Sequence, residues 1–254
     1  MTQVKNLKDL PTLSKLGTTN SLLATENATG KSYRMSAANL KSELGSISID
    51  DVMDNVFIMY HHSSDNYTVC FRPSEWAAQE AAGNVATGVL LIDGGRKLVI
   101  APQEKTSTWS TCQLECGTKQ ADRLLAQELY NGKENCAKIL TNTTLAAEGD
   151  ASAVGWCNAY ERINAGGKGL KAGAWWLPSL GELYLMFANY TKINYALSKI
   201  SGATLLSKQP YWSCTEYSAQ GAWFLYFSGG TQDYNFKSTN QYRVRPVSAF
   251  AMAT

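Results

Sequence analysis

The sequence lacks the features that would place the chain in a membrane or on a nucleic acid. No apolar run approaches the 18 residues that a transmembrane helix needs. The first twenty residues are polar and mixed in charge, so we expect neither membrane insertion nor a secretory signal peptide. Lys and Arg nearly balance Asp and Glu, 23 against 21, and form no basic stripe. We therefore expect no nucleic-acid partner.

Residues that carry out catalysis or bind metals are also scarce. The only histidines, His61 and His62, are expected to be a solvent-exposed pair. A Ser or Cys hydrolase needs a histidine beside its nucleophile. Cys112 and Cys116 have no second Cys or His pair near them, as a zinc site would require. We expect no catalytic residue, no metal and no cofactor. The six cysteines are expected to be free thiols, and one or two disulfides formed later are the alternative.

Aromatic residues, by contrast, are abundant. The chain has 13 Tyr and 7 Trp, concentrated after residue 150, and the stretch YWSCTEYSAQGAWFLYFSGG at 211–230 is the densest run. Rigid aromatic rings are typical both of β-rich cores and of recognition surfaces. We expect Trp175, Trp176, Trp212 and Trp223 to be core residues.

Local patterns predict an α+β fold. Strand patterns with turn signals occur at 22–35, 54–62, 67–73 and 87–102, where Asp93-Gly94-Gly95 forms the last turn. Helical periodicity occurs at 119–143, 150–163 and 178–200, and a short helix is expected at 37–44. The segment 74–82 is either a helix or a loop. Short aromatic strands return in the final forty residues. Helices between two strand-rich regions favour α+β over a parallel α/β sheet.

Three pieces of the chain carry a family resemblance: GVLLIDGGRKLVIAPQE (88–104), WWLPSLGELYLMFAN (175–189) and the run of YWSCTEYS, AWFLYFSGG and VRPVSAF (211–250). Together they resemble the C-type-lectin-like variable proteins of diversity-generating retroelements, which share the formylglycine-generating-enzyme-like fold and include the major tropism determinant of phages. The resemblance covers roughly 85–250. LATENATGKSYRMSAANL (23–40) resembles leader segments of tail-fibre proteins from phages of gut Bacteroidales, over a shorter stretch.

The resemblance implies a receptor-binding protein (adhesin) at the tip of a phage tail fibre. The family displays a variable surface on a lectin-like scaffold, here about 211–242, which binds a host-cell-surface protein or glycan. It also implies a homotrimer in the virion, made in the bacterial host cytoplasm. The expected domains are an attachment and oligomerisation segment at 1–50 that contacts other tail-fibre proteins, a small β linker region at 51–84, and the lectin-like domain at 85–254.

In this family the retroelement substitutes adenines, commonly at AAY codons. Such codons yield Tyr, Ser, Asp, Gly, Phe, Thr, Cys or Asn, but not Trp, Glu or Met. Strand alternation in AWFLYF puts Trp223, Leu225 and Phe227 on one face, which we expect to be buried, and Phe224 and Tyr226 on the other. A one-residue slip would exchange the faces. The expected ligand-binding residues are Tyr217, Ser218, Phe224, Tyr226, Asp233, Tyr234, Asn235, Phe236, Ser238, Thr239, Asn240 and Tyr242.

Two other functions stay open on the sequence. One is a bacterial or prophage-encoded lectin-like protein with a fixed ligand, and the other is a copper-dependent oxidase of the related fold. The oxidase needs a cysteine pair near the C-terminus, where only Cys214 occurs, at a position commonly serine in the family and therefore expected to be changeable. Glu216 is expected to be a structural brace. Arg243 and Arg245 are expected to pair with a structural carboxylate, with Glu182 and Glu216 as candidates.

Overall fold

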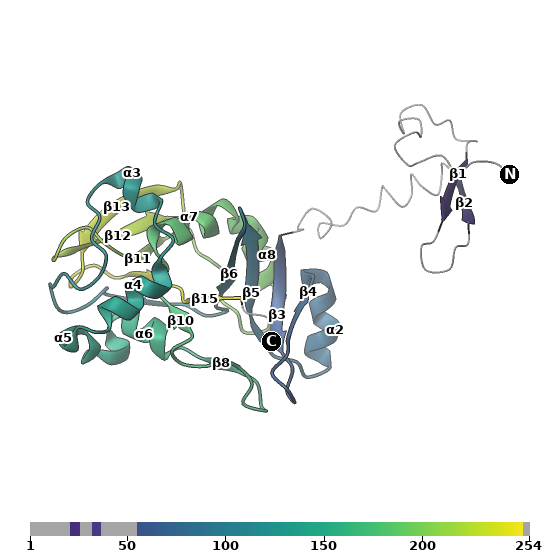
Figure 1. The fold of residues 1–254 in the computed structure, drawn as a ribbon, viewed down its shortest axis with the longest axis horizontal. Helices are drawn as coiled ribbons and strands as arrows, with labels where there is room; N and C mark the ends of the chain where they lie inside the picture. Colours follow the sequence, from purple (N-terminus) through teal and green to yellow (C-terminus); the bar gives the residue numbers. More distant parts are fainter. Residues whose placement is uncertain (1–20, 26–31, 37–54, 251–254) are drawn as a thin grey trace. The chain divides into compact units, whose positions relative to one another are not determined.

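The computed structural model describes residues 21–25, 32–36 and 55–250 (Figure 1). By its internal contacts the chain divides into two units, 1–54 and 55–254. In the first unit, β1 (Ser21–Thr25) pairs antiparallel with β2 (Ser32–Ser36). This confirms the two strands predicted at 22–35. Their predicted turn and the predicted helix at 37–44 lie outside the described residues.

The second unit contains two larger sheets, whose antiparallel pairs and accompanying helices make the fold α+β. The first sheet has the order β10-β15-β6-β5-β3-β4. Its strands are β3 (Val56–His61), β4 (Thr68–Phe71), β5 (Ala86–Asp93), β6 (Arg96–Ile100), β10 (Trp175–Trp176) and β15 (Val247–Ala249). The β5–β6 turn is the predicted one, with positive φ at Gly94 and Gly95. β3 and β4, which lie in the expected linker region at 51–84, belong to this sheet because β3 pairs with both β4 and β5.

The second sheet has the order β13-β12-β11-β14-β7. Its strands are β7 (Lys105–Ser107), β11 (Pro210–Glu216), β12 (Gly221–Tyr226), β13 (Thr231–Phe236) and β14 (Tyr242–Val244). All its pairs are antiparallel except that between β11 and β14. β13 pairs only with β12, so it is an edge strand. A short separate ribbon joins β8 (Arg162–Ile163) and β9 (Gly169–Leu170).

Helices lie beside these sheets (Figure 1). They are the 3-10 turns η4 (Pro73–Glu75) and η5 (Gly149–Ala151), and the α-helices α2 (Trp76–Ala81), α3 (Arg123–Gln127), α4 (Gly132–Ile139), α5 (Thr143–Ala146), α6 (Ala153–Ala159), α7 (Leu180–Ala188) and α8 (Tyr190–Leu197). The segment at 74–82 is therefore largely helical. The predicted helices at 119–143, 150–163 and 178–200 are each divided or shortened.

The predicted helices are divided where hydrogen bonds to distant parts of the chain form. α7 begins with a capping box in which Ser179 is the N-cap and Glu182 accepts from the Ser179 amide at 2.8 Å. The chain between α3 and α4 leaves the helical path at Leu129, whose carbonyl accepts from the Ser179 hydroxyl at 2.7 Å and from the Gly181 amide at 3.0 Å. Asn189 separates α7 from α8, and its amide donates to Asp93 Oδ2 at 2.7 Å. Tertiary hydrogen bonds therefore interrupt the sequence periodicity.

The main core cluster joins residues of both sheets and of the helices. Trp212 is fully buried in this cluster, Trp223 is 3% exposed and Trp176 is 7% exposed, while Trp175 lies in a smaller cluster on the other side of the first sheet. The prediction that these four tryptophans form core is confirmed. The second sheet is therefore anchored by large buried rings on β11 and β12.

The burial of the cysteines predicts their order of alkylation. Burial raises the pKa of Cys157 and Cys214 well above its usual value, and both are fully buried free thiols. Cys112 and Cys116 are partly exposed. Because alkylation requires the thiolate, iodoacetamide at pH 8 should label Cys112 and Cys116 first and should reach Cys157 and Cys214 only after unfolding. Mass spectrometry of native and urea-unfolded protein measures this, and native labelling of Cys214 as fast as Cys112 would contradict it.

Candidate binding surface

Large apolar side chains are exposed beside the edge strand β13. Among the described residues nine large hydrophobic side chains are exposed, and five of them lie on β13, on α3 or on the loop that precedes α3. We call this set the edge patch: Leu114, Leu124, Leu125, Tyr234 and Phe236, which are 39%, 65%, 51%, 45% and 54% exposed. Figure 1 shows α3 next to β13 at one end of the domain.

Hydrogen bonds hold the three parts of the edge patch together. The Arg123 guanidinium on α3 donates to the Gln232 carbonyl at 3.0 Å, and the Gln232 side-chain amide donates back to the Arg123 carbonyl at 2.6 Å. The Lys237 ammonium, directly after β13, donates to the Leu114 carbonyl at 2.7 Å. The exposed apolar side chains therefore stand on a fixed backbone framework.

A pair of stacked tyrosines borders the edge patch. The rings of Tyr217 and Tyr234 lie parallel, with centroids 3.5 Å apart and an interplanar angle of 4°. Both rings meet the buried Trp223 edge-on, at 5.4 and 5.9 Å, and the Trp223 indole donates to the Gln120 carbonyl at 2.6 Å. A hydrogen bond with Tyr217 raises the pKa of Tyr234. A scaffold tryptophan thus orients two of the predicted binding residues.

The outer backbone edge of β13 is occupied by its own side chains. The Tyr234 amide donates to Asp233 Oδ1 at 2.8 Å, and the Phe236 amide donates to Asn235 Oδ1 at 2.9 Å. Arg123 occupies the carbonyl of Gln232. Free N–H and C=O groups on an edge strand would invite strand addition, and these bonds reduce that tendency. Strand addition at this edge of the sheet is therefore disfavoured.

The prediction for β12 is correct at four positions and wrong at one. Trp223, Leu225 and Phe227 are buried and Tyr226 is 38% exposed, as expected. Phe224 is only 9% exposed, although it was expected to face outward. Its ring packs on Tyr242 at 4.7 Å and on Trp212 at 6.2 Å. The segment that follows β13 returns as β14 and brings Tyr242 over this face of the sheet, so both faces of β12 are covered at Phe224.

The other predicted binding residues fall into two groups. Asp233 and Thr239 are exposed, and Ser218, Asn235, Ser238, Asn240 and Tyr242 are half-buried. The Asn240 side-chain amide donates to Asn235 Oδ1 at 2.8 Å, and the Asn235 amide donates to the Tyr242 hydroxyl at 2.7 Å. The structure therefore brings Asn235, Asn240 and Tyr242 together as a polar cluster. Tyr234 and Phe236 belong to the edge patch.

Sequence reasoning missed the three leucines of the edge patch. Leu124 and Leu125 lie in a segment whose periodicity predicts one long amphipathic helix, with its leucines facing the core. In the structure α3 is only five residues long, and Ala126 is its buried residue. One feature of the sequence pointed to exposure: two neighbouring leucines cannot both occupy one narrow helix face.

A buried ion pair supports the surface from below. The Glu216 carboxylate pairs with the Lys237 ammonium, and both side chains are fully buried. The carboxylate also accepts from the Cys116 amide at 3.1 Å and from the Gly117 amide at 2.5 Å. The ammonium lies 4.4 Å from the centre of the Trp109 ring. Glu216 is thus placed as a structural brace that ties β11 and the end of β13 to the 109–118 loop.

The predicted partners of Arg243 and Arg245 are wrong. Glu182 belongs to the capping box and Glu216 pairs with Lys237. Both arginines instead pair with Glu104: Arg245 at 2.7 Å and Arg243 at 3.6 Å. Glu104 Oε2 also accepts from the Tyr211 hydroxyl at 2.7 Å. The antiparallel pairing of β14 with β7 sets Val244 opposite Lys105 and so brings both arginines beside Glu104.

Tyr211 makes stability depend on alkaline pH. Burial raises its pKa from 10.0 to about 12. The unfolded state therefore loses the Tyr211 proton first, and the contribution of this group, present below pH 10, is lost between about pH 10 and 12. In Tyr211→Phe the fall in urea midpoint across this window should be smaller than in the wild type. Equal falls in the two proteins would show that Tyr211 does not contribute to the pH dependence.

Cys214 and His61 are both buried, which differs from expectation. Cys214 was expected to be a changeable position, but it is fully buried and its amide donates to the Pro178 carbonyl at 2.9 Å. His61, expected to be half of an exposed pair, is buried, and its ring nitrogen lies 2.9 Å from the Thr87 hydroxyl. Burial lowers the pKa of His61.

Within the part of the chain that the structure describes, no three His, Cys, Asp or Glu residues are grouped to hold a metal ion. None of the described helices is long and apolar enough to span a membrane.

Comparisons with known proteins show a structural likeness. No family model and no curated protein matches the chain. A solved structure, a fimbrial protein from Bacteroides ovatus, is similar with 16% sequence identity and a TM-score of 0.45. The likeness covers 80% of this chain and 46% of the fimbrial protein, so the chain spans less than half the length of that protein.

Proposed function

We propose that this protein is an adhesin that binds a receptor on the surface of a host cell through the edge patch and the adjoining β12–β13 residues. The observation that carries the proposal is the concentration of exposed large apolar side chains at one edge of the second sheet. Soluble proteins rarely expose contiguous apolar patches of this kind unless they are used in binding. Aromatic residues such as Tyr234 and Phe236 are the types that contribute most to protein interfaces.

We further propose that the chain is a C-type-lectin-like variable protein of a diversity-generating retroelement, at the tip of a phage tail fibre. Burial along 231–237 supports this. The two buried residues there, Gln232 and Lys237, are outside the set that AAY codons can yield. Thr231, Asp233, Tyr234, Asn235 and Phe236 are exposed or half-buried, and all five belong to that set. Diversification would then change displayed side chains and spare those that hold the strand.

The remaining parts of the proposal follow from the family resemblance. The segment at 1–50 would attach the protein to other tail-fibre proteins and join three copies into a trimer in the virion. Light scattering of the full chain tests this part on its own. A stable monomer would remove the trimer from the proposal and leave the receptor-binding surface in place.

The binding function is tested with purified full chain on a panel of candidate host strains. The proposal expects saturable binding to some strains and not to others, with loss of binding after the cells are treated with protease or with glycosidases. Equal, unsaturable adsorption to every strain would contradict an adhesin. The two treatments also decide whether the receptor is a protein or a glycan.

Diversification is tested from the surrounding DNA. A nearby template repeat should differ from the segment encoding about 211–242 almost solely at adenines, beside a reverse transcriptase gene. A binding protein without such a repeat would be a lectin-like adhesin with a fixed ligand, and the diversification part of the proposal would be wrong.

A further inference from the structure

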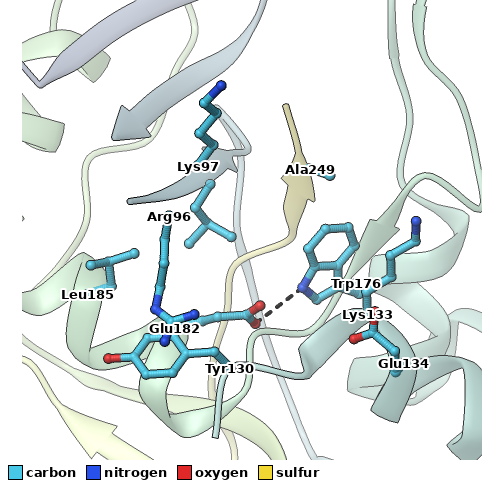
Figure 2. Close-up of a pocket in the computed structure, with 10 residues that line it drawn as sticks. Arg96, Lys97, Tyr130, Lys133, Glu134, Trp176, Glu182, Leu185 and Ala249 are labelled. Atoms are coloured by element: carbon cyan, nitrogen blue, oxygen red, sulfur yellow. Dashed lines mark hydrogen bonds between the residues drawn. The ribbon is translucent and has the colours of Figure 1, made fainter. Parts of the chain in front are cut away.

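A cavity with unpaired cations lies away from the edge patch, between the first sheet and the helices α4 and α7. Its volume is about 240 Å³. It is lined by side chains of β6, β10, β15, α4 and α7 and by Tyr130, and it contains none of the predicted binding residues. Figure 2 shows Arg96 and Lys133 on its two sides, with Glu182 and Trp176 between them in that view.

Arg96 is held in a fixed orientation without a carboxylate partner. Its guanidinium lies over the Tyr130 ring, 3.6 Å from the ring centre. Among the described residues, neither Arg96 nor Lys133 has an ion pair. Stacking on an aromatic ring leaves the N–H groups at the edge of a guanidinium available for bidentate bonds to a carboxylate. Arg96 is therefore prepared to bind an anion.

The Glu182 carboxylate in the cavity is already hydrogen-bonded within the protein. Glu182 Oε2 accepts from the Trp176 indole at 3.2 Å and from the Ser179 amide at 2.8 Å. These bonds belong to the start of α7, and among the described residues no ion pair joins Glu182 to Arg96. Leu98 and Leu185 supply apolar wall. Three cationic side chains therefore line the cavity, Arg96, Lys97 and Lys133, together with the polar groups of Glu182 and Trp176 and the apolar side chains of the two leucines.

From this geometry we propose that the cavity binds an acidic monosaccharide, whose carboxylate is held by Arg96, whose hydroxyls reach Lys133, and whose C–H face lies on the leucines. A carboxylate on a small ring compound suits the bidentate geometry of Arg96, and the volume suits a single sugar ring. The site is independent of the edge patch, so the proposed adhesin function stands or fails separately.

The test uses two probes that differ in one group, glucuronate and glucose, with the full chain and isothermal titration calorimetry. Glucuronate should bind in the millimolar range and glucose at least about tenfold more weakly. Arg96→Met should weaken glucuronate binding about tenfold or more, because it removes a charge-assisted pair. Glu134→Gln should strengthen binding, because Glu134 is an anion at the rim of the cavity.

Lys199→Met is the matched control, because Lys199 is not among the residues that line the cavity. It removes the same charge from an exposed side chain after α8, whose ammonium lies 4.8 Å from the centre of the Tyr195 ring. It should change glucuronate affinity less than about twofold. Equal binding of glucose and glucuronate, equal losses in Arg96→Met and Lys199→Met, or no glucuronate binding would overturn the proposal.

Discussion

Lys237→Met is expected to destabilise the domain by about 3–5 kcal/mol, because it removes one partner of a buried ion pair. The Glu216 carboxylate would stay fully buried without a cation, and only two backbone amides of the 109–118 loop would donate hydrogen bonds to it. The Leu114 carbonyl would also lose its donor. Urea unfolding at neutral pH measures the difference in the free energy of unfolding.

Lys119→Met is the matched control for charge. Lys119 pairs with Glu115 at 3.0 Å, but the two side chains are 47% and 45% exposed. An exposed pair contributes about 0–1 kcal/mol. If Lys237→Met and Lys119→Met had the same free energy of unfolding, the brace would not support the surface above it.

Gly155→Ala is expected to destabilise the protein by about 1–3 kcal/mol, the usual cost of overpacking. Helix propensity alone predicts the opposite, a gain of about 1 kcal/mol, because Gly155 lies inside α6. A methyl group on Gly155 would lie 1.8 Å from the Gly149 carbonyl oxygen, which belongs to the backbone of η5 and cannot turn away as a side chain would. Packing should therefore outweigh propensity.

Gly229→Ala serves as the control, since nothing lies within 4 Å of the position of the added methyl group and its φ is not in the left-handed region. Its free energy of unfolding should differ from the wild type by less than about 0.5 kcal/mol. A Gly155→Ala protein as stable as the wild type would show that η5 can move away from α6.

Short-range patterns predicted much of the fold. The β5–β6 turn, the capping box of α7 and the burial of four tryptophans follow from local sequence, because turn glycines, N-caps and strand alternation depend on neighbouring residues. The divided helices did not follow from it. The break before α4 depends on Leu129 accepting hydrogen bonds from Ser179 and Gly181, fifty residues away in the sequence.

The candidate surface was predicted only in part, because the rest of it depends on contacts between segments that are far apart in the sequence. Alternation correctly separated Trp223 from Tyr226 on β12. It failed at Phe224 because Tyr242 covers that position, which depends on how β14 returns beside β11. The Glu104 partner of Arg245 is 141 residues away, and no spacing rule would find it. The place of Leu124 and Leu125 in the edge patch could not be predicted, because it depends on the Arg123–Gln232 hydrogen bonds that hold α3 next to β13.

The measurement that tests the central claim most directly compares host-cell binding by two variants. Tyr234→Ser with Phe236→Ser removes the two aromatic rings of the edge patch, and Tyr67→Ser removes a ring that is 55% exposed on the distant β3–β4 hairpin. The account predicts that the first protein loses at least about 2 kcal/mol of binding free energy, the size of an interface hot spot. Tyr67→Ser should bind like the wild type. Unchanged binding by the folded double variant would contradict the assignment of the edge patch as the receptor-binding surface.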